Sequence, residues 1–192
     1  MVRMKSCAAL AACAALAACA ALSPMGEPVR RAPAFDLVGR VAVKYDGRAF
    51  SSAVRWQHQA DSDEISLLTP VGQTLAHIVA DSSGATLTGA DRRQIQAGDV
   101  ESLTRRGLGW ELPLTRLAWW VRAEIVPGGV IGEVTRDQEG RLVRLVQDGW
   151  SIVFVHRLPE EGSRLPQRLE LEREGYQIRL VIDNWPRGGD AP

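Results

Sequence analysis

Residues 35–57 read FDLVGRVAVKYDGRAFSSAVRWQ, and apolar and polar side chains alternate along both halves of this stretch. Strict alternation is typical of β-strands with one buried face, because successive side chains of a strand point to opposite sides. Asp46-Gly47 separates the two halves, and this dipeptide tolerates the positive φ angles of tight hairpin turns. The stretch therefore predicts an antiparallel hairpin.

The same alternation returns along most of the remaining chain. Turn signals such as Pro70-Val71-Gly72, Asp148-Gly149 and Glu174-Gly175 separate the segments. Local connections of this kind favour an up-and-down order, in a sheet large enough to curl. We therefore predict a single, mainly β domain. Its further strands are expected at 64–69, 74–81, 85–90, 130–136, 141–147, 150–156, 167–173 and 176–183, and 92–96 brings the number to about eleven.

Two segments in the middle of the chain follow a helical pattern instead. Asp99 can cap a short helix that ends at Gly107, and Pro113 can open a second helix that runs to about Arg122. Apolar residues of the second helix recur at i, i+3, i+4 and i+7, which places them on one face. A curled sheet needs a cover for its apolar concave side, and these helices are the candidates.

The N-terminus carries the pattern of an export signal. Arg3 and Lys5 precede an apolar run, residues 6–18, that is too short to span a bilayer. The run ends in the lipobox Leu16-Ala17-Ala18-Cys19, in which the cysteine accepts the lipid. Leu10-Ala11-Ala12-Cys13 repeats this tetrapeptide, but cleavage there leaves a shorter apolar core, so Cys19 is the preferred lipidation site.

This signal divides the chain into four expected parts: a signal peptide (1–18), a lipidated cysteine with a flexible, proline-containing tether (19–34), one folded domain (35–186) and a tail (187–192). Ala20, in place of the aspartate that retains many lipoproteins in the inner membrane, favours the inner leaflet of the outer membrane, with the domain facing the periplasm. No cysteine follows residue 19, so the fold depends on its core rather than on disulfides.

Catalytic, metal-binding and nucleic-acid-binding patterns are absent from the predicted domain. His58, His77 and His156 lie far apart, without a second ligand at metal-binding spacing. The 23 basic residues are dispersed and balanced by 23 acidic ones, which argues against nucleic acid. No serine-nucleophile or dinucleotide motif occurs. We expect neither an enzyme nor a metal or cofactor, although carboxylates assembled from distant strands would escape this search.

The turn after residue 68 departs from ordinary turn chemistry, because Val71 stands at its tip between a proline and a glycine. Either this valine folds back against its own strand, or it is exposed for a purpose. With its surroundings the turn resembles the LolB family of outer-membrane lipoprotein receptors. The residues that carry the resemblance are Gly39, Trp56, Pro70-Val71-Gly72, Leu112-Pro113-Leu114, Leu117, Trp120, Gly149-Trp150, Leu165-Pro166, Leu169, Leu171 and Asp183-Asn184-Trp185.

The resemblance implies an open, unclosed antiparallel barrel of about eleven strands that encloses an apolar cavity covered by helices. LolB-like proteins accept lipoproteins from a soluble, LolA-like periplasmic carrier, hold their acyl chains in the cavity and insert them into the outer membrane. By this resemblance Leu68, Pro70, Val71 and Gly72 form the loop for insertion into membrane lipid. The expected cavity lining is Phe50, Val54, Trp56, Leu114, Leu117, Trp120, Trp150 and Ile152.

Two features of the chain depart from the family pattern. The tether leaves no room for the helix that often precedes the first strand, and Ala123 stands where relatives tend to have glycine. We expect a monomer that works without a cofactor. The alternative is a lipid-tethered β domain with a filled core that binds a partner protein or the cell wall.

Overall fold

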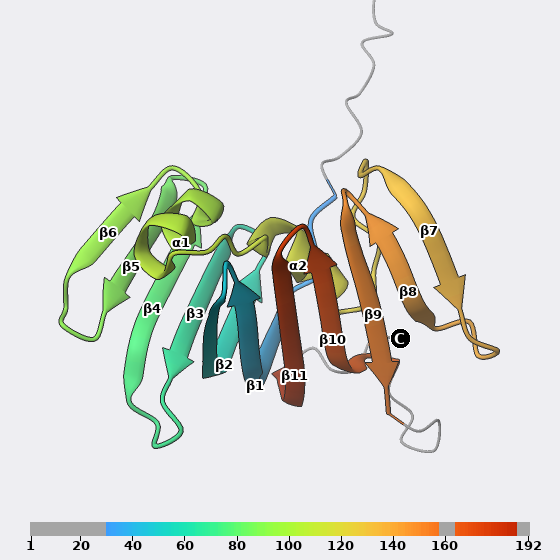
Figure 1. The fold of residues 1–192 in the computed structure, drawn as a ribbon, viewed down its shortest axis with the longest axis horizontal. Helices are drawn as coiled ribbons and strands as arrows, with labels where there is room; N and C mark the ends of the chain where they lie inside the picture. Colours follow the sequence, from blue (N-terminus) through green and yellow to red (C-terminus); the bar gives the residue numbers. More distant parts are fainter. Residues whose placement is uncertain (1–29, 158–163, 188–192) are drawn as a thin grey trace, which may run out of the picture. The chain divides into compact units, whose positions relative to one another are not determined.

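A computed structural model describes residues 30–157 and 164–187. Within these residues the chain forms eleven strands and two helices (Figure 1). The elements are β1 (Phe35–Tyr45), β2 (Arg48–Gln59), β3 (Ser62–Leu68), β4 (Thr74–Asp81), β5 (Gly84–Gly89), β6 (Gln94–Ala97), α1 (Val100–Leu108), α2 (Leu114–Trp120), β7 (Ile131–Arg136), β8 (Leu142–Gln147), β9 (Trp150–His156), β10 (Pro166–Arg173) and β11 (Tyr176–Arg187). The predicted strands and helices are thus all present.

All eleven strands belong to one antiparallel sheet with the order β6-β5-β4-β3-β2-β1-β11-β10-β9-β8-β7. The prediction of an open, eleven-stranded antiparallel sheet is confirmed. The prediction of a purely local, up-and-down order is wrong at one place, because β1 pairs with β11 and joins two meanders, β1–β6 and β7–β11. The helical segment separates β6 from β7, so these strands become the two edges of the sheet.

The pairing of β1 with β11 explains the glycine at position 39. A Cβ atom built on Gly39 would lie 2.1 Å from the carbonyl oxygen of Val181 on β11. Register shifts on both sides of Val38 accompany this close approach. Only glycine lets the two backbones come so near, and the sheet bends around this region.

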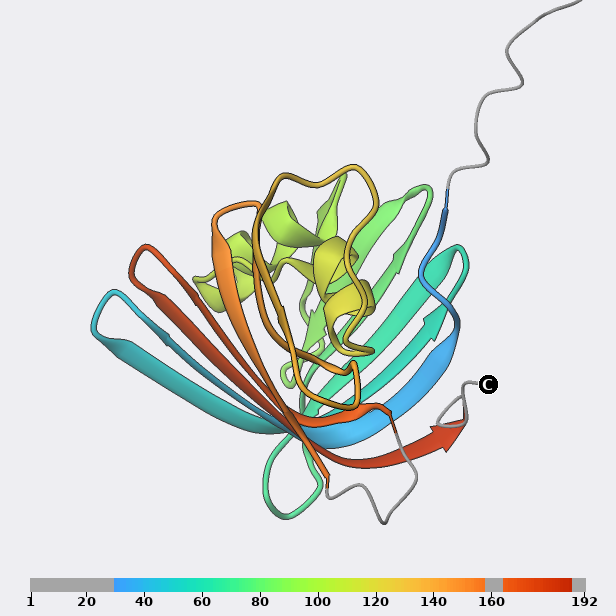
Figure 2. The same cartoon turned by 90° about the vertical axis from the view of Figure 1, so that its right-hand side faces the viewer.

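The sheet curves around α1 and α2, which lie on its concave side (Figure 2). Helix α1 starts as predicted, because the carboxylate of Asp99 accepts a hydrogen bond of 2.7 Å from the backbone N–H of Ser102. It ends at Gly109, which has a φ of +80°, and not at Gly107. Gly107 lies within the helix, where a Cβ would come within 3.0 Å of Leu87 on β5.

Helix α2 buries the face that its periodicity predicted. Leu114, Leu117, Ala118 and Val121 are all buried. The helix ends at Trp120, before the predicted Arg122, and the chain turns at Ala123 with a φ of +56°. This left-handed conformation suits glycine, which is the residue that the family resemblance leads one to expect there.

The packed region begins slightly before the first strand. Ala32 is buried in the core, and Arg31 forms an ion pair of 2.7 Å with Asp61. These contacts involve the last residues of the predicted tether. The predicted signal peptide, the lipidated Cys19, most of the tether and the end of the tail lie outside the described residues. Neither described helix has the length and apolarity needed to cross a membrane.

Candidate functional site

The concave face of the sheet and the inner sides of the helices form one apolar surface. A cavity of about 30 Å³ remains between them, and every residue that lines it is apolar or aromatic. Four of the predicted lining residues, Val54, Trp56, Leu114 and Leu117, lie on its wall. The sequence analysis did not predict the other lining residues, which are Leu37, Val41, Ile65, Leu67, Ile78, Leu108, Trp110, Leu112, Ile178 and Leu180.

This cavity is small for a ligand site. Sites for small molecules typically have volumes of roughly 300–1,000 Å³, whereas roughly 30 Å³ is the share of one water molecule in the liquid. The enclosed space between the sheet and the helices is therefore much smaller in this structure than a typical ligand site. Large side chains, among them Trp56 and Trp110, fill the space under the helices.

The other four predicted lining residues pack outside this cavity. Trp120, Trp150 and Ile152 are buried and Phe50 is half-buried in the same core. The indole N–H of Trp120 donates to the side-chain oxygen of Gln147 at 3.1 Å, and Gln147 is itself fully buried. Trp120, Gln147 and Trp150 hold α2 against β8 and β9, a role that alternation alone does not distinguish from lining a cavity.

Trp56 has a fixed orientation on the cavity wall. Its indole N–H donates to the carboxylate of Asp63 at 2.6 Å, and the same oxygen lies 2.8 Å from Nδ1 of His58. The ring of Phe35 meets Trp56 edge-on, with the centroids 4.9 Å apart. Hydrogen bonding and ring packing together keep this side chain in place.

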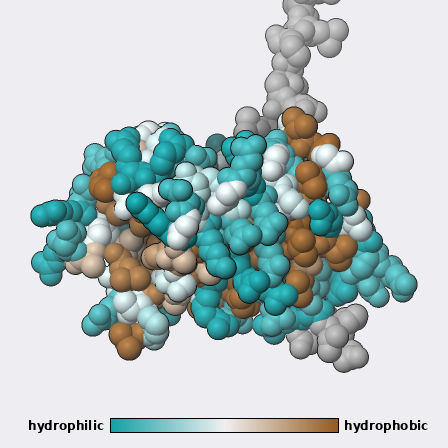
Figure 3. Space-filling model, in the orientation of Figure 1, coloured by the Kyte–Doolittle hydropathy of each residue, from teal (hydrophilic) through white to brown (hydrophobic). Residues whose placement is uncertain are grey.

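The loop between β3 and β4 presents the second feature of the site. The N–H of Gly72 donates to the carbonyl of Thr69 at 2.9 Å, and Gly72 has a φ of +83°. Thr69 and Gln73 close the loop through a backbone bond of 2.8 Å. Val71 at the tip is 81% exposed, so it does not fold back against its strand. Figure 3 shows hydrophobic atoms at the lower end of the molecule, where Figure 1 places this loop.

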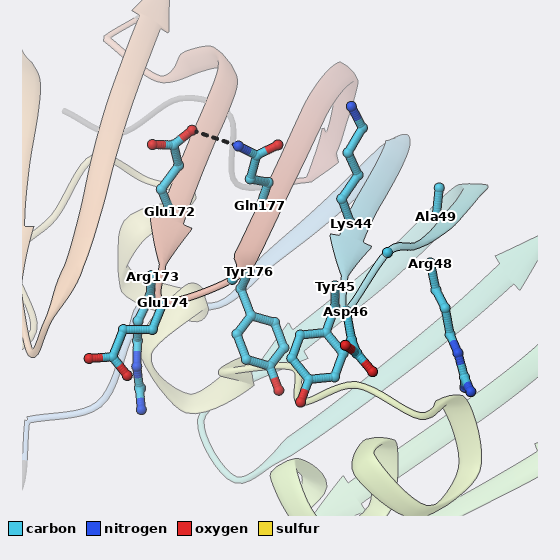
Figure 4. A pocket seen from close by; sticks show the side chains of 12 residues that line it. Lys44, Tyr45, Asp46, Arg48, Ala49, Glu172, Arg173, Glu174, Tyr176 and Gln177 are labelled. Carbon is cyan, nitrogen blue, oxygen red and sulfur yellow. Dashed lines mark hydrogen bonds between the residues drawn. The ribbon is translucent and has the colours of Figure 1, made fainter.

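A hollow of about 480 Å³ lies at the end of the sheet where β1 meets β2 and β10 meets β11 (Figure 4). The rings of Tyr45 and Tyr176 stack there with centroids 4.0 Å apart. Burial and a hydrogen bond with Tyr45 raise the pKa of Tyr176 to about 12. Charged side chains of both signs, such as Arg48 and Glu174, line the rest of the hollow. Its polar character separates it from the apolar cavity.

The sequence model of the family "Outer membrane lipoprotein LolB" matches residues 33–185, which cover every described strand and helix except the last two residues of β11. The chain belongs to the LolB family. It is 40% identical over 162 residues to an outer-membrane lipoprotein LolB of Nitrosomonas europaea, a match that covers 82% of this chain and 76% of the relative. It is 38% identical over 184 residues to the LolB of Chromobacterium violaceum, covering 96% of this chain and 97% of that protein.

Among solved structures, the chain is similar to a LolA superfamily protein of Nitrosomonas europaea. The TM-score is 0.44 and the sequence identity 12%, over 84% of this chain and 90% of that chain. Membership of the LolB family places the chain among the lipid-anchored lipoproteins of the outer membrane. In the described residues, no group of three or more His, Cys, Asp or Glu side chains is arranged to hold a metal ion.

Proposed function

We propose that this LolB family protein accepts lipoproteins from a LolA-like periplasmic carrier, binds their acyl chains under α1 and α2, and inserts them into the outer membrane. The observation that carries the proposal is Val71, an aliphatic side chain 81% exposed at the tip of a well-ordered loop. Burying such a side chain in an apolar phase contributes about 1.5–3 kcal/mol, so the tip favours contact with lipid.

The energetics of acyl chains favour direct transfer between two proteins. Each methylene contributes about 0.8 kcal/mol when it leaves water, so one chain of a dozen or more methylenes costs on the order of 10 kcal/mol to expose. Transfer between two apolar sites avoids this cost. No bond is made or broken, and the proposed reaction therefore requires neither a catalytic group nor a cofactor.

The N-terminal segment completes the proposal. Signal cleavage after Ala18 makes Cys19 the lipidated first residue, and the segment that follows tethers the domain, whose packed part begins near Arg31 and Ala32. Ala20 favours the inner leaflet of the outer membrane, where the monomeric domain faces the periplasm. Mass spectrometry of the mature N-terminal peptide distinguishes lipidation of Cys19 from lipidation of Cys13.

A transfer assay tests the central step. A LolA-like carrier loaded with labelled lipoprotein is mixed with this protein, and the label is followed by immunoprecipitation of each partner. We expect the label to move to this protein without added nucleotide. Absence of transfer at a stoichiometric excess of this protein would contradict the proposal.

Val71→Glu separates acceptance from insertion. A carboxylate at the tip resists entry into lipid, whereas the cavity is not altered. We expect this variant to accept lipoprotein from the carrier but to lose insertion into liposomes. Val130→Glu is the matched control, because Val130 is 77% exposed on another part of the domain and should tolerate the change in both assays. Equal loss of acceptance and insertion in Val71→Glu would mean that Val71 has a structural role.

The small cavity favours a second candidate function, a lipid-tethered domain with a filled core that binds a partner protein or the cell wall. The two candidates differ in their uptake of apolar ligands. A fluorescent fatty acid should bind to an acyl-chain site and should show no saturable binding to a filled core. Saturable binding with a stoichiometry near one therefore favours the lipoprotein receptor.

A further inference from the structure

Two tryptophans line the apolar cavity, and they are held in different ways. Trp56 lies on a central strand and donates its indole N–H to Asp63. Trp110 is also buried, with only 6% of its surface exposed, but it forms no hydrogen bond to another described residue through its indole N–H, which is not among the fully buried unpartnered polar atoms of the described residues. Its ring is tilted against that of Phe50, with centroids 6.3 Å apart. Packing alone therefore holds Trp110 in the cavity.

The backbone around Trp110 belongs to no strand or helix. Gly109, in the left-handed conformation, precedes it at the end of α1. Leu112 follows, and its N–H donates to the hydroxyl of Thr104 in a buried hydrogen bond of 3.0 Å. Residues 109–111 thus form a short segment, called the arc below. It lies between Gly109, whose backbone tolerates many conformations, and Leu112, which is held by its hydrogen bond to Thr104. The arc can move without breaking a hydrogen bond of the sheet.

The strands and the helix that form the rest of the cavity wall cannot move as easily as the arc. Strands β1–β4 and β11 are paired along their lengths. Helix α2 is tied to β8 through Trp120 and Gln147, and to the following turn through an ion pair of 2.9 Å between Arg116 and Asp148. Among the large side chains of the cavity, Trp110 is the one whose departure disrupts the least.

The polar hollow at the end of the sheet lies close to the start of the arc. Arg48, which lines the hollow of about 480 Å³, approaches within 3.8 Å of the position of a Cβ on Gly109. Figure 4 shows Tyr45, Tyr176 and Arg48 extending on the side of the sheet where the helices lie. An ion pair between Arg105 of α1 and Glu111, both partly exposed, links the arc to the helix.

We propose that Trp110 is a displaceable plug, which occupies part of the acyl-chain site in the absence of cargo and swings toward this hollow when a chain enters. The inference rests on the proposed function and adds to it the residue that limits access to the site. Exchange of an indole ring for an acyl chain keeps the concave face apolar and dry in both states. The small cavity is then the unloaded form of the site.

Removal of the ring tests the plug directly. We would measure binding of cis-parinaric acid to the full chain carrying Cys19→Ala, so that no acyl anchor of its own competes, with and without Trp110→Ala and Trp110→Phe. If the plugged state is about nine-tenths populated, its removal raises the apparent affinity about tenfold. We expect Trp110→Ala to reach this gain and Trp110→Phe to lie between it and the parent chain. A folded Trp110→Ala variant that binds no tighter than the parent overturns the plug.

Glu111→Gln provides a test that leaves every apolar lining residue in place. Loss of the ion pair with Arg105 should release the arc and raise the affinity for the probe, by less than Trp110→Ala does. Asp183→Asn is the matched control. It removes the ion pair between Asp183 of β11 and Arg40 of β1, whose side chains are exposed to a similar degree as those of Arg105 and Glu111. If Trp110→Ala fails to fold, these two variants decide: equal affinities of Glu111→Gln and Asp183→Asn overturn the plug.

The carrier transfer assay keeps the two proposals distinguishable. Transfer to the parent chain, together with unchanged probe affinity in Trp110→Ala and Glu111→Gln, overturns the plug and leaves the proposed function intact. No transfer to the parent chain or to either variant overturns the proposed function, and the plug with it.

Discussion

Ala123 shows how a single residue can carry backbone strain at the end of a helix. Its φ of +56° lies in the left-handed region, where an L-residue with a Cβ is disfavoured by about 1–2 kcal/mol. Glycine avoids this cost but loses about 0.5–1 kcal/mol more conformational entropy on folding. We therefore expect Ala123→Gly to raise the free energy of unfolding by up to about 1 kcal/mol, measured by urea denaturation. Ala118→Gly, within α2, should instead lower it, and an equal loss in both variants would contradict the explanation.

Asp148 connects three elements and makes their association depend on pH. Its carboxylate accepts hydrogen bonds from Arg116 of α2 at 2.9 Å and from the N–H of Val130 before β7 at 2.8 Å. These bonds, led by the one from Arg116, lower the pKa of Asp148 in the folded protein. A lowered folded pKa stabilises the fold above the unfolded value of about 3.9, and this contribution is lost as the pH falls through the folded pKa.

We therefore expect Asp148→Asn to lower the melting temperature at neutral pH, and the difference from the parent chain to shrink as the pH falls below about 4. Melting curves followed by circular dichroism across this range test the expectation. Asp46→Asn is the control, since Asp46 occupies the corresponding hairpin position with a similar φ of +49°. Asparagine is favoured in such turns, so this variant should keep the melting temperature of the parent chain at neutral pH. A loss of melting temperature in Asp148→Asn that does not change with pH would mean that the charge of Asp148 does not contribute to stability.

At the scale of the whole molecule, the pairing of β1 with β11 turns two meanders into one sheet. Gly39→Ala places a methyl group against the carbonyl of Val181, and overpacking of this kind costs about 1–3 kcal/mol or more. Because both halves depend on this pairing, we expect one cooperative transition at lower temperature, coincident by circular dichroism and tryptophan fluorescence. Ala42→Val, an exposed change on the same strand, should preserve stability. Unchanged stability of Gly39→Ala would show that the backbones can separate at little cost.

Most of the architecture was predictable because its signals are local. Alternation, turn dipeptides and the Asp99 cap each lie within a few residues, and they located all eleven strands and both helices to within about four residues. The pairing of Val41 with Leu180 was not predictable in this way, since residues so distant in sequence leave no local pattern. The lining of the cavity was likewise not predictable from local patterns. Strand alternation indicated that Trp56 and Trp150 both face inward, but only Trp56 lies on the cavity wall.

The sequence by itself determined the order of the elements, the inward faces of the strands and the aliphatic tip at Val71, because each depends on residue types at short spacing. It also determined the resemblance to the LolB family, because short motifs recur in a fixed order along the chain. Only the tertiary structure decided that Trp110 fills the space under the helices and that β1 joins β11. Both outcomes depend on side-chain volumes and backbone distances between segments far apart in the chain. Packing of this kind is a property of the assembled fold, since each side chain takes the space that its neighbours leave.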